Sequence, residues 1–286
     1  MSFDLIDRFS SVASRYDVVL CDIWGVVHDG IAAHAQACDA LMRYRSEGGT
    51  VVLITNAPRP SPWVAHQLDR LGVPADAYDD VMTSGDLTRE VVAGRKGGAV
   101  FHIGPQRDIS IFDGLDVRFT PVEAAEYVVC SGLFDDTKET PDNYRDLMAT
   151  MRSRDLFMLC ANPDLVVERG AERVYCAGAI ADLYGALGGD VLYAGKPHRP
   201  IYDAALAKAA AARGAAAAPG RTLAIGDSLR TDMRGARALG IDGLFVSGGI
   251  HATELGQSQS PSQDALIAMF AAADVTPQAV TPRLVW

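Results

Sequence analysis

Short apolar runs rich in β-branched residues alternate with longer amphipathic stretches over the first part of the chain. A short apolar run predicts a buried strand, and apolar positions recurring every three or four residues predict a helix. The predicted elements alternate as strand and helix in the order Val18–Cys21, Ala32–Glu47, Thr50–Ile54, Trp63–Leu71 and Val81–Thr83. This alternation is typical of a parallel sheet covered by helices.

The same alternation returns near the end of the chain, in the order Val191–Tyr193, Pro200–Arg213, Thr222–Ile225, Asp232–Leu239 and Leu244–Val246. We therefore expect residues 1–85 and 191–286 to build one sheet together. Residues 86–190 between them are long enough for a separate small domain. They carry their own predicted strands at Val100–Ile103, Glu126–Cys130 and Leu156–Cys160. The sequence thus predicts an α/β core domain interrupted by an inserted α/β domain.

The amino-acid composition and net charge limit the kinds of partner that we expect for this protein. Of the 286 residues, 49% are hydrophobic and 22% are charged, which allows a well-filled core. The formal net charge is −10 and no run of basic residues stands out, so neither nucleic acid nor a membrane is expected as the main partner. Because Met1–Arg15 lacks the apolar stretch of a signal peptide, a cytoplasmic location is expected. The Ser- and Gln-rich segment Gly256–Gln263 is predicted to be a loop.

The cysteines form no CxxC pair, and several lie inside apolar, strand-like runs. There a thiol behaves as a small buried hydrophobic group, so a structural role is expected. The five residues are Cys21, Cys38, Cys130, Cys160 and Cys176.

Polar residues follow four of the predicted strands, and in an open parallel sheet functional residues gather just beyond the carboxyl ends of the strands. Asp22 follows the first strand, with Gly25 permitting a tight loop behind it. Taken alone, this aspartate fits an ordinary turn as well as a catalytic site. Thr55 and Asn56 follow the second strand, where a hydroxyl and an amide can bind an anion or cap a turn.

The other two strand ends carry charge. Lys196 follows a strand and a glycine, although most lysines are simply solvated surface charges. Asp227 and Asp232 lie beside the end of the strand Thr222–Ile225. Carboxylates in such an arrangement suit Mg²⁺, a hard ion that binds one or two carboxylates, several waters and substrate phosphate.

In this order, the four strand ends resemble the four sequence motifs of the haloacid dehalogenase (HAD) superfamily. Two later stretches, Cys160–Asp164 and Ala177–Ala181 with the following Gly188–Val191, look like those of its NagD-like subgroup, class IIA. The resemblance runs from about Val18 to Gly248. It implies a Rossmann-like core, with residues 86–190 forming a cap of the C2 type.

The resemblance also implies a Mg²⁺-dependent phosphatase that acts on a small phosphorylated metabolite through an aspartyl-phosphate intermediate. Asp22 would be the nucleophile, Thr55 would bind a phosphoryl oxygen, and Lys196 would stabilise the transferring charge. The metal would be held by Asp22, by the backbone carbonyl of Trp24 and by Asp227. Asp232 and Ser228 would support that metal site from behind.

Substrate selection would fall to the inserted domain and to the loop after the second strand. Asn56, Asn162 and Asp164 are expected to face the substrate, although Asn-Pro-Asp is also a common turn. Caps of this class often join homodimers, so a homodimer is expected from the resemblance.

Trp24 departs from the pattern. Phosphatases of this superfamily usually carry a second aspartate there, which protonates the leaving oxygen and then deprotonates water. Indole has no such chemistry near neutral pH, so a rate factor of about 10²–10⁴ is missing or supplied elsewhere. His28 or Asp29 could supply it, the substrate could have a leaving group that needs little protonation, or the protein could be a non-catalytic binding or regulatory protein. Dehalogenation is disfavoured, since it would not need the pair Asp227 and Asp232.

Overall fold

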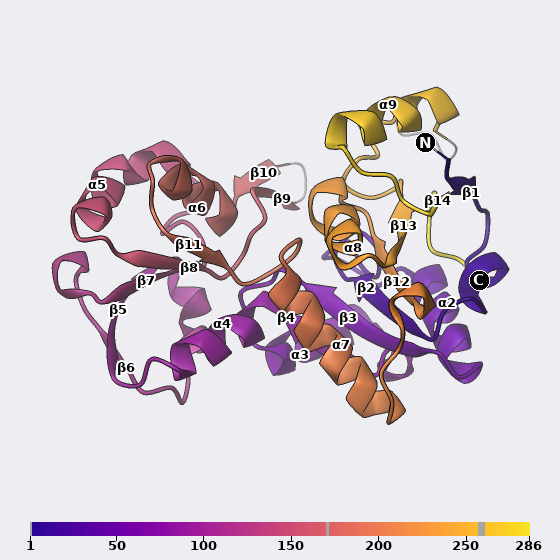
Figure 1. Ribbon diagram of the computed structural model, residues 1–286, viewed down its shortest axis with the longest axis horizontal. Helices are drawn as coiled ribbons and strands as arrows, with labels where there is room; N and C mark the ends of the chain where they lie inside the picture. Colours follow the sequence, from indigo (N-terminus) through magenta and orange to yellow (C-terminus); the bar gives the residue numbers. More distant parts are fainter. Residues whose placement is uncertain (1, 170–171, 257–260) are drawn as a thin grey trace. The chain divides into compact units, whose positions relative to one another are not determined.

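The structure is a computed structural model and describes residues 2–169, 172–256 and 261–286. The chain divides into two compact units (Figure 1). The first comprises the chain up to Thr55, Val64–Met82 and Lys196–Trp286, and the second comprises Asn56–Trp63 and Thr83–Gly195. The predicted loop Gly256–Gln263 includes residues 257–260, which lie outside the described residues.

The first unit is built on a seven-stranded sheet in the order β1-β14-β13-β12-β2-β3-β4 (Figure 1). The pairs from β1 through to β3 are all parallel. All five residues of β2 are buried, as expected for a central strand covered on both faces. The strands are β1 (Asp4–Leu5), β2 (Val18–Asp22), β3 (Thr50–Thr55), β4 (Asp80–Thr83), β12 (Thr222–Gly226), β13 (Asp242–Val246) and β14 (Ala279–Thr281).

Helices pack against this sheet through apolar residues that recur at helical spacing. In α7 (Arg199–Arg213), Ile201, Ala205 and Ala209 recur every four residues and are all buried. The helix ends at Gly214, which adopts the left-handed conformation that favours glycine. The others are α1 (Ser10–Ala13), α2 (Ala35–Ser46), α3 (Ser61–Leu71), α8 (Arg234–Leu239) and α9 (Gln263–Ala273), with short helical turns at Ala75–Ala77, Pro219–Arg221 and Leu229–Met233.

The second unit has its own parallel sheet, in the order β11-β8-β7-β5-β6. An antiparallel hairpin of β9 and β10 accompanies it. The strands are β5 (Gly98–Ile103), β6 (Val117–Phe119), β7 (Tyr127–Cys130), β8 (Phe157–Cys160), β9 (Val166–Arg169), β10 (Glu172–Tyr175) and β11 (Val191–Tyr193). The helices are α4 (Ser84–Ala93), α5 (Arg145–Ser153) and α6 (Ala177–Ala186), with short turns at Gln106–Phe112, Val122–Ala124 and Pro141–Tyr144.

Alternate residues of β7 and β8 pack into two different cores, one on each face of the second sheet. Val128 and Met158 belong to a cluster that includes buried residues of α5 and α6. Val129 and Leu159 belong to a second cluster, which includes Val92 of α4. Burial on both faces explains why these strands read as continuous apolar runs in the sequence.

The predicted α/β class, with a Rossmann-like parallel sheet interrupted by an inserted α/β domain, is confirmed. One strand was assigned to the wrong sheet: Val191–Tyr193 pairs with β8 in the second unit. The apolar pattern predicts a strand but does not identify its partner. The five cysteines are buried free thiols, as expected. None of the helices in the described residues is long and apolar enough to cross a membrane.

Candidate active site

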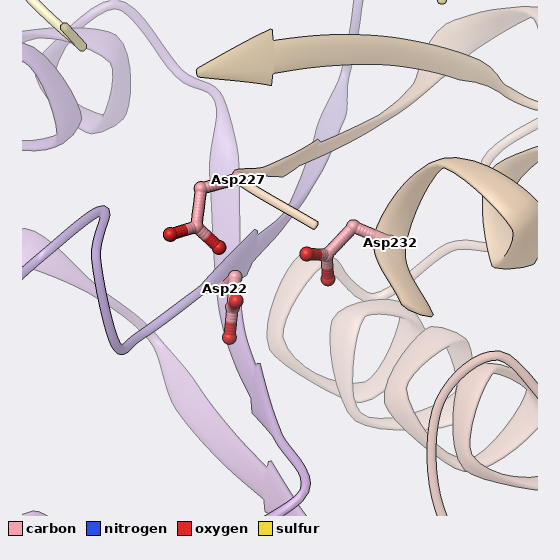
Figure 2. A group of neighbouring side chains, drawn as sticks. All are labelled: Asp22, Asp227 and Asp232. Atoms are coloured by element: carbon pink, nitrogen blue, oxygen red, sulfur yellow. The ribbon is translucent and has the colours of Figure 1, made fainter. Parts of the chain in front are cut away.

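Three aspartates converge at the carboxyl edge of the first sheet. Asp22 is the last residue of β2, Asp227 directly follows β12, and Asp232 lies in the helical turn Leu229–Met233. Because β2 and β12 are adjacent parallel strands, their carboxyl ends meet at the same edge. All three side chains are buried, and one oxygen of each lies within 4.8 Å of the others. Figure 2 shows the carboxylates pointing toward one another.

Lys196 neutralises part of this charge. Its Nζ lies 2.7 Å from Oδ1 of Asp22 and 2.7 Å from Oδ1 of Asp232. Burial opposes the ammonium charge, since the residue is only 2% exposed, but the two carboxylates outweigh it and hold the pKa of Lys196 well above its usual value. The site therefore contains a permanent cation in contact with the predicted nucleophile.

The single ammonium group of Lys196 does not balance three carboxylates, so the site keeps an excess of negative charge. Burial, followed by repulsion from Asp22, raises the pKa values of both Asp227 and Asp232. A hard divalent cation bound by oxygen atoms would relieve that repulsion. The donors present at this edge of the sheet therefore fit Mg²⁺.

Three glycines allow the backbone to approach these carboxylates. A Cβ at Gly25 or at Gly249 would lie 2.0 Å from Oδ2 of Asp227, and a Cβ at Gly226 would lie 2.1 Å from Cγ of Asp232. We call Gly25, Gly226 and Gly249 the glycine cradle. Gly25 also has a φ of +82°, which other residues rarely adopt. No side chain fits at these positions without moving a carboxylate.

Backbone amides hold the carboxylates in place. Ile250 N donates to Oδ2 of Asp227 at 2.8 Å, and Ser228 N donates to Oδ2 of Asp232 at 3.2 Å. The Ser228 hydroxyl accepts a bond from Thr231 N at 3.4 Å, as a helix cap. Ser228 thus contacts the site through its backbone. Thr55 ends the neighbouring strand β3, directly after Ile54, whose partner in the sheet is Asp22.

Trp24 lies on the loop that leaves β2. Its indole covers Gly30, where a Cβ would lie 2.5 Å from the ring, and its ring centroid lies 5.2 Å from that of His28. The side chain is nevertheless 43% exposed. The loop is closed by a bond from Gly25 N to the carbonyl oxygen of His28, at 2.8 Å.

The two residues considered as substitutes for the missing acid are engaged in this loop. His28 is buried, its Nδ1 accepts a bond from Gly30 N at 3.0 Å, and burial lowers its pKa. Asp29 is exposed, and its Oδ1 accepts bonds from the amides of Ala32 and Ile31, which lower its pKa. Asp29 therefore acts as a turn-forming residue.

The three predicted substrate-binding residues lie together in the second unit. The Asn56 amide donates to Oδ1 of Asp164 at 2.9 Å, and Asn162 Oδ1 accepts a bond from Asp164 N at 3.1 Å. Gly178, in the first turn of α6, packs against the carbonyl oxygen of Pro163. Its backbone amide donates to the carbonyl oxygen of Asp164 at 3.1 Å. The Asn-Pro-Asp segment is thus a turn fixed by α6.

Two residues near the first site were missed by the sequence interpretation. Gly249 was not considered, although a glycine can mark a site where another part of the chain approaches the backbone closely. Tyr202 of α7 is buried, and its hydroxyl donates to the carbonyl oxygen of Thr231 at 3.2 Å. Nothing in the local sequence pattern identifies that distant partner.

Comparison with known proteins identifies two matching stretches of the chain. Residues 19–118 match a family model described as haloacid dehalogenase-like hydrolase, and residues 193–273 match one described as HAD-hydrolase-like. A crystal structure from Brucella suis 1330, described as a hydrolase of the haloacid dehalogenase-like family, is 46% identical, with a TM-score of 0.86. The alignment covers 98% of this chain and 100% of that one.

Other similar proteins are more distant. The D-glycerol 3-phosphate phosphatase of Mycobacterium tuberculosis is 30% identical over 247 residues, which cover 84% of this chain and 65% of the relative. This chain thus spans less than two thirds of that relative. The structure of the mycobacterial glycerol phosphate phosphatase with magnesium has a TM-score of 0.64 at 26% identity, covering 84% of this chain and 70% of that one. NagD of E. coli K-12 has a TM-score of 0.66 at 23% identity, and the alignment covers 94% of this chain and 96% of that one.

Proposed function

This chain belongs to the haloacid dehalogenase-like hydrolase family, with the fold of its NagD-like class IIA, and we propose that it is a Mg²⁺-dependent phosphatase acting on a small phosphorylated metabolite. The observation that carries the proposal is the contact between Lys196 and both Asp22 and Asp232 beside a third buried carboxylate. The mycobacterial relative, a glycerol phosphate phosphatase, supports the reaction class.

In the first half of the proposed reaction, Asp22 attacks phosphorus and the bond to the leaving oxygen breaks, which gives an aspartyl phosphate. Lys196 stabilises the charge shared by Asp22 and the phosphoryl group, and Thr55 donates its hydroxyl to a phosphoryl oxygen. Mg²⁺, held by Asp22, Asp227 and the carbonyl oxygen of Trp24, would neutralise repulsion between carboxylate and phosphate. Asp232, supported by the Ser228 amide, would keep that arrangement in place.

In the second half, water attacks the same phosphorus and the bond to Asp22 breaks. Asp22 is restored as a carboxylate, and inorganic phosphate leaves. We further propose that Asn56, Asn162 and Asp164 contribute to substrate binding, because the bond between Asn56 and Asp164 fixes two of their polar groups. We also propose that the inserted second unit is a cap domain that selects the substrate, and that the protein forms a homodimer.

A non-catalytic binding protein is the second candidate, and Trp24 is the observation that favours it. Both candidates keep the carboxylate cluster, and both bind Mg²⁺ and phosphate. Only the phosphatase should release phosphate from its substrate, so measuring phosphate release distinguishes the two candidates.

The first prediction concerns Asp22→Asn, which removes the nucleophile's charge and leaves its shape. We expect phosphate release from an aryl phosphate in the presence of Mg²⁺ to fall by at least about 10³-fold, because a neutral amide does not form the phosphoenzyme. The wild-type rate should also disappear on addition of EDTA.

The matched control is Asp29→Asn, the same change on an exposed turn of the same loop, which should keep most of the activity. Circular dichroism verifies that both variants fold. If Asp22→Asn retains a substantial part of the wild-type rate, the nucleophile is assigned wrongly; if the wild type releases no phosphate at all, the binding role replaces the enzyme.

A further inference from the structure

The chain passes between the two units directly beside two residues of the proposed reaction. One segment of the first unit ends at Thr55, and the second unit begins at Asn56. The second unit ends at Gly195, and the first resumes at Lys196. Because consecutive Cα atoms across a trans peptide bond are only about 3.8 Å apart, whatever fixes Asn56 and Gly195 also restricts the backbone of Thr55 and Lys196.

Asn56 and Gly195 contact each other inside the second unit. A Cβ at Gly195 would lie 2.4 Å from Oδ1 of Asn56 and 2.8 Å from Cδ of Pro163. The Nδ2 of the same Asn56 amide donates to Oδ1 of Asp164 at 2.9 Å. Asn56 and Gly195 are both buried, so this amide has little room to move. We call Asn56, Pro163, Asp164 and Gly195 the junction cluster.

The helix α6 also contacts the Asn-Pro-Asp turn of this cluster. A Cβ at Gly178, in the first turn of α6, would lie 2.3 Å from the carbonyl oxygen of Pro163 and 2.5 Å from that of Asp164. Neither Gly178 nor Gly195 has a positive φ. Space, and not backbone conformation, therefore excludes a side chain at both glycines.

The loop Asn56–Trp63 is bonded to the second unit at further points. Gly85 N donates to the carbonyl oxygen of Ala57 at 3.1 Å, and Ser61 N donates to Oδ1 of Asp86 at 2.9 Å. The loop is thus held at both its beginning and its middle. A shift at its first residue cannot be absorbed by a slack segment behind it.

We propose that the junction cluster positions Thr55 and Lys196 on the phosphoryl group, and that Gly195 is a positioning residue of the reaction. This inference rests on the proposed phosphatase function and names the part of the chain that places two of its groups. Groups that stabilise one phosphoryl group have to be held at hydrogen-bond distance from it. A misplacement of about 1 Å can lower a rate about 10²-fold.

The metal ligands do not depend on the junction cluster in this way. Asp22 and Asp227 lie inside segments of the first unit, and their peptide neighbours belong to the same unit. A change in the junction cluster should therefore weaken phosphate binding much more than Mg²⁺ binding. A loss of folding stability alone would change neither affinity of the folded protein.

Gly195→Ala tests the proposal, because the new Cβ displaces either the Asn56 amide or the rigid ring of Pro163. With an aryl phosphate as substrate, we expect kcat to fall about 10–100-fold. The inhibition constant of inorganic phosphate should rise about tenfold or more, while Mg²⁺ affinity, measured by calorimetric titration, should change by less than about threefold. Gly178→Ala, whose Cβ meets only the turn, should show the same pattern with smaller changes.

Gly185→Ala is the matched control. Gly185 lies in α6 of the same unit with no atom within 4 Å of its Cβ position, so this variant should bind phosphate and turn over as the wild type does. The double variant Asn56→Ala/Gly195→Ala removes the amide that the new Cβ meets. Because both changes act on one contact, its loss in kcat/KM should be smaller than the product of the two single losses.

The outcomes distinguish this inference from the proposed function. If the wild type releases no phosphate beyond the Asp22→Asn background, the phosphatase function itself fails. If the wild type is active and folded Gly195→Ala binds phosphate as tightly, the positioning role is overturned. Equal losses of Mg²⁺ and phosphate affinity, or single losses that simply multiply in the double variant, overturn it too. Circular dichroism verifies folding, and if Gly195→Ala does not fold, the same measurements on Gly178→Ala decide.

Discussion

Burial and immediate partners decide which single residues carry charge in this molecule. Lys196 is buried but keeps its proton, because two carboxylates contact its ammonium group. Among the described residues, no carboxylate contacts His102 of the second unit. Its Nε2 lies 2.9 Å from the Ser131 hydroxyl and its ring packs edge-on against Phe112, so burial lowers its pKa to about 4.

This pKa predicts a dependence of stability on pH. His102 is neutral in the folded state near pH 7, whereas in the unfolded state its pKa is about 6.5. Its contribution is therefore complete above about pH 6.5 and is lost as the pH falls toward about 4, because the unfolded chain binds the proton first. We expect wild type to lose up to about 3 kcal/mol more free energy of unfolding than His102→Gln over that range.

Urea unfolding of both proteins at several pH values measures this difference. His66→Gln, a change of the exposed histidine in α3, is the matched control and should follow the wild type. Parallel pH curves for wild type and His102→Gln would mean that His102 is protonated equally in the folded and unfolded states.

The polar residues at the ends of β2, β3 and β12 were predictable, because these adjacent parallel strands end at one edge of the first sheet. Lys196 follows β11 of the second sheet, so its place in the cluster did not follow from that rule. Asp22, Lys196, Asp227 and Asp232 are indeed in one cluster. The bonds of Tyr202 to Thr231 and of Asn56 to Asp164 join residues far apart in the sequence. Such contacts depend on three-dimensional packing, which one sequence without variation does not reveal.

At the scale of elements, loops rather than strands set the geometry of the acidic cluster. The turn after β2 places Gly25 against Asp227, and the loop after β13 places Gly249 against the same carboxylate. The strand pattern predicted most of the sheet but assigned Val191–Tyr193 to the wrong one and missed β1 and β14. Short strands carry too few residues for their pattern to select a partner.

Gly25→Ala tests the loop after β2. The variant has to accommodate both a positive φ, at a cost of about 1–2 kcal/mol, and a Cβ inside the space of Asp227. We expect Mg²⁺ affinity, measured by calorimetric titration, to fall by about 10–100-fold because the carboxylate is displaced.

Gly48→Ala separates the effect of a positive φ from the effect of a Cβ that displaces Asp227. Gly48 has a φ of +92° and no atom within 4 Å of its Cβ position, so this variant should lose similar stability but keep its Mg²⁺ affinity. Equal affinities in the two variants would argue against a role for Gly25 in positioning Asp227.

At the scale of the whole molecule, each unit has its own sheet and its own apolar clusters. Met158 is fully buried in β8 of the second unit, and Leu53 is fully buried in β3 of the first. Truncating either to alanine should cost about 2–5 kcal/mol by leaving a cavity. With separate cores, that loss should stay within the unit that contains the cavity.

We therefore expect Met158→Ala to speed amide hydrogen exchange in β5, β7 and β8 while β2 and β12 keep their protection. Leu53→Ala should give the reverse pattern. Mass spectrometry of exchanged peptides resolves these strands. If either variant accelerates exchange evenly in both sheets, the two units unfold as one cooperative body.

The glycine cradle has a consequence for the evolution of this chain. Any mutation at Gly25, Gly226 or Gly249 introduces a Cβ into space already filled by Asp227 or Asp232, so these three codons tolerate very little change. Trp24, the residue before Gly25, packs against Gly30 and His28 on one side, but much of its surface faces solvent. Substitutions at this position can therefore alter the exposed surface of the loop while the backbone around Asp227 stays unchanged.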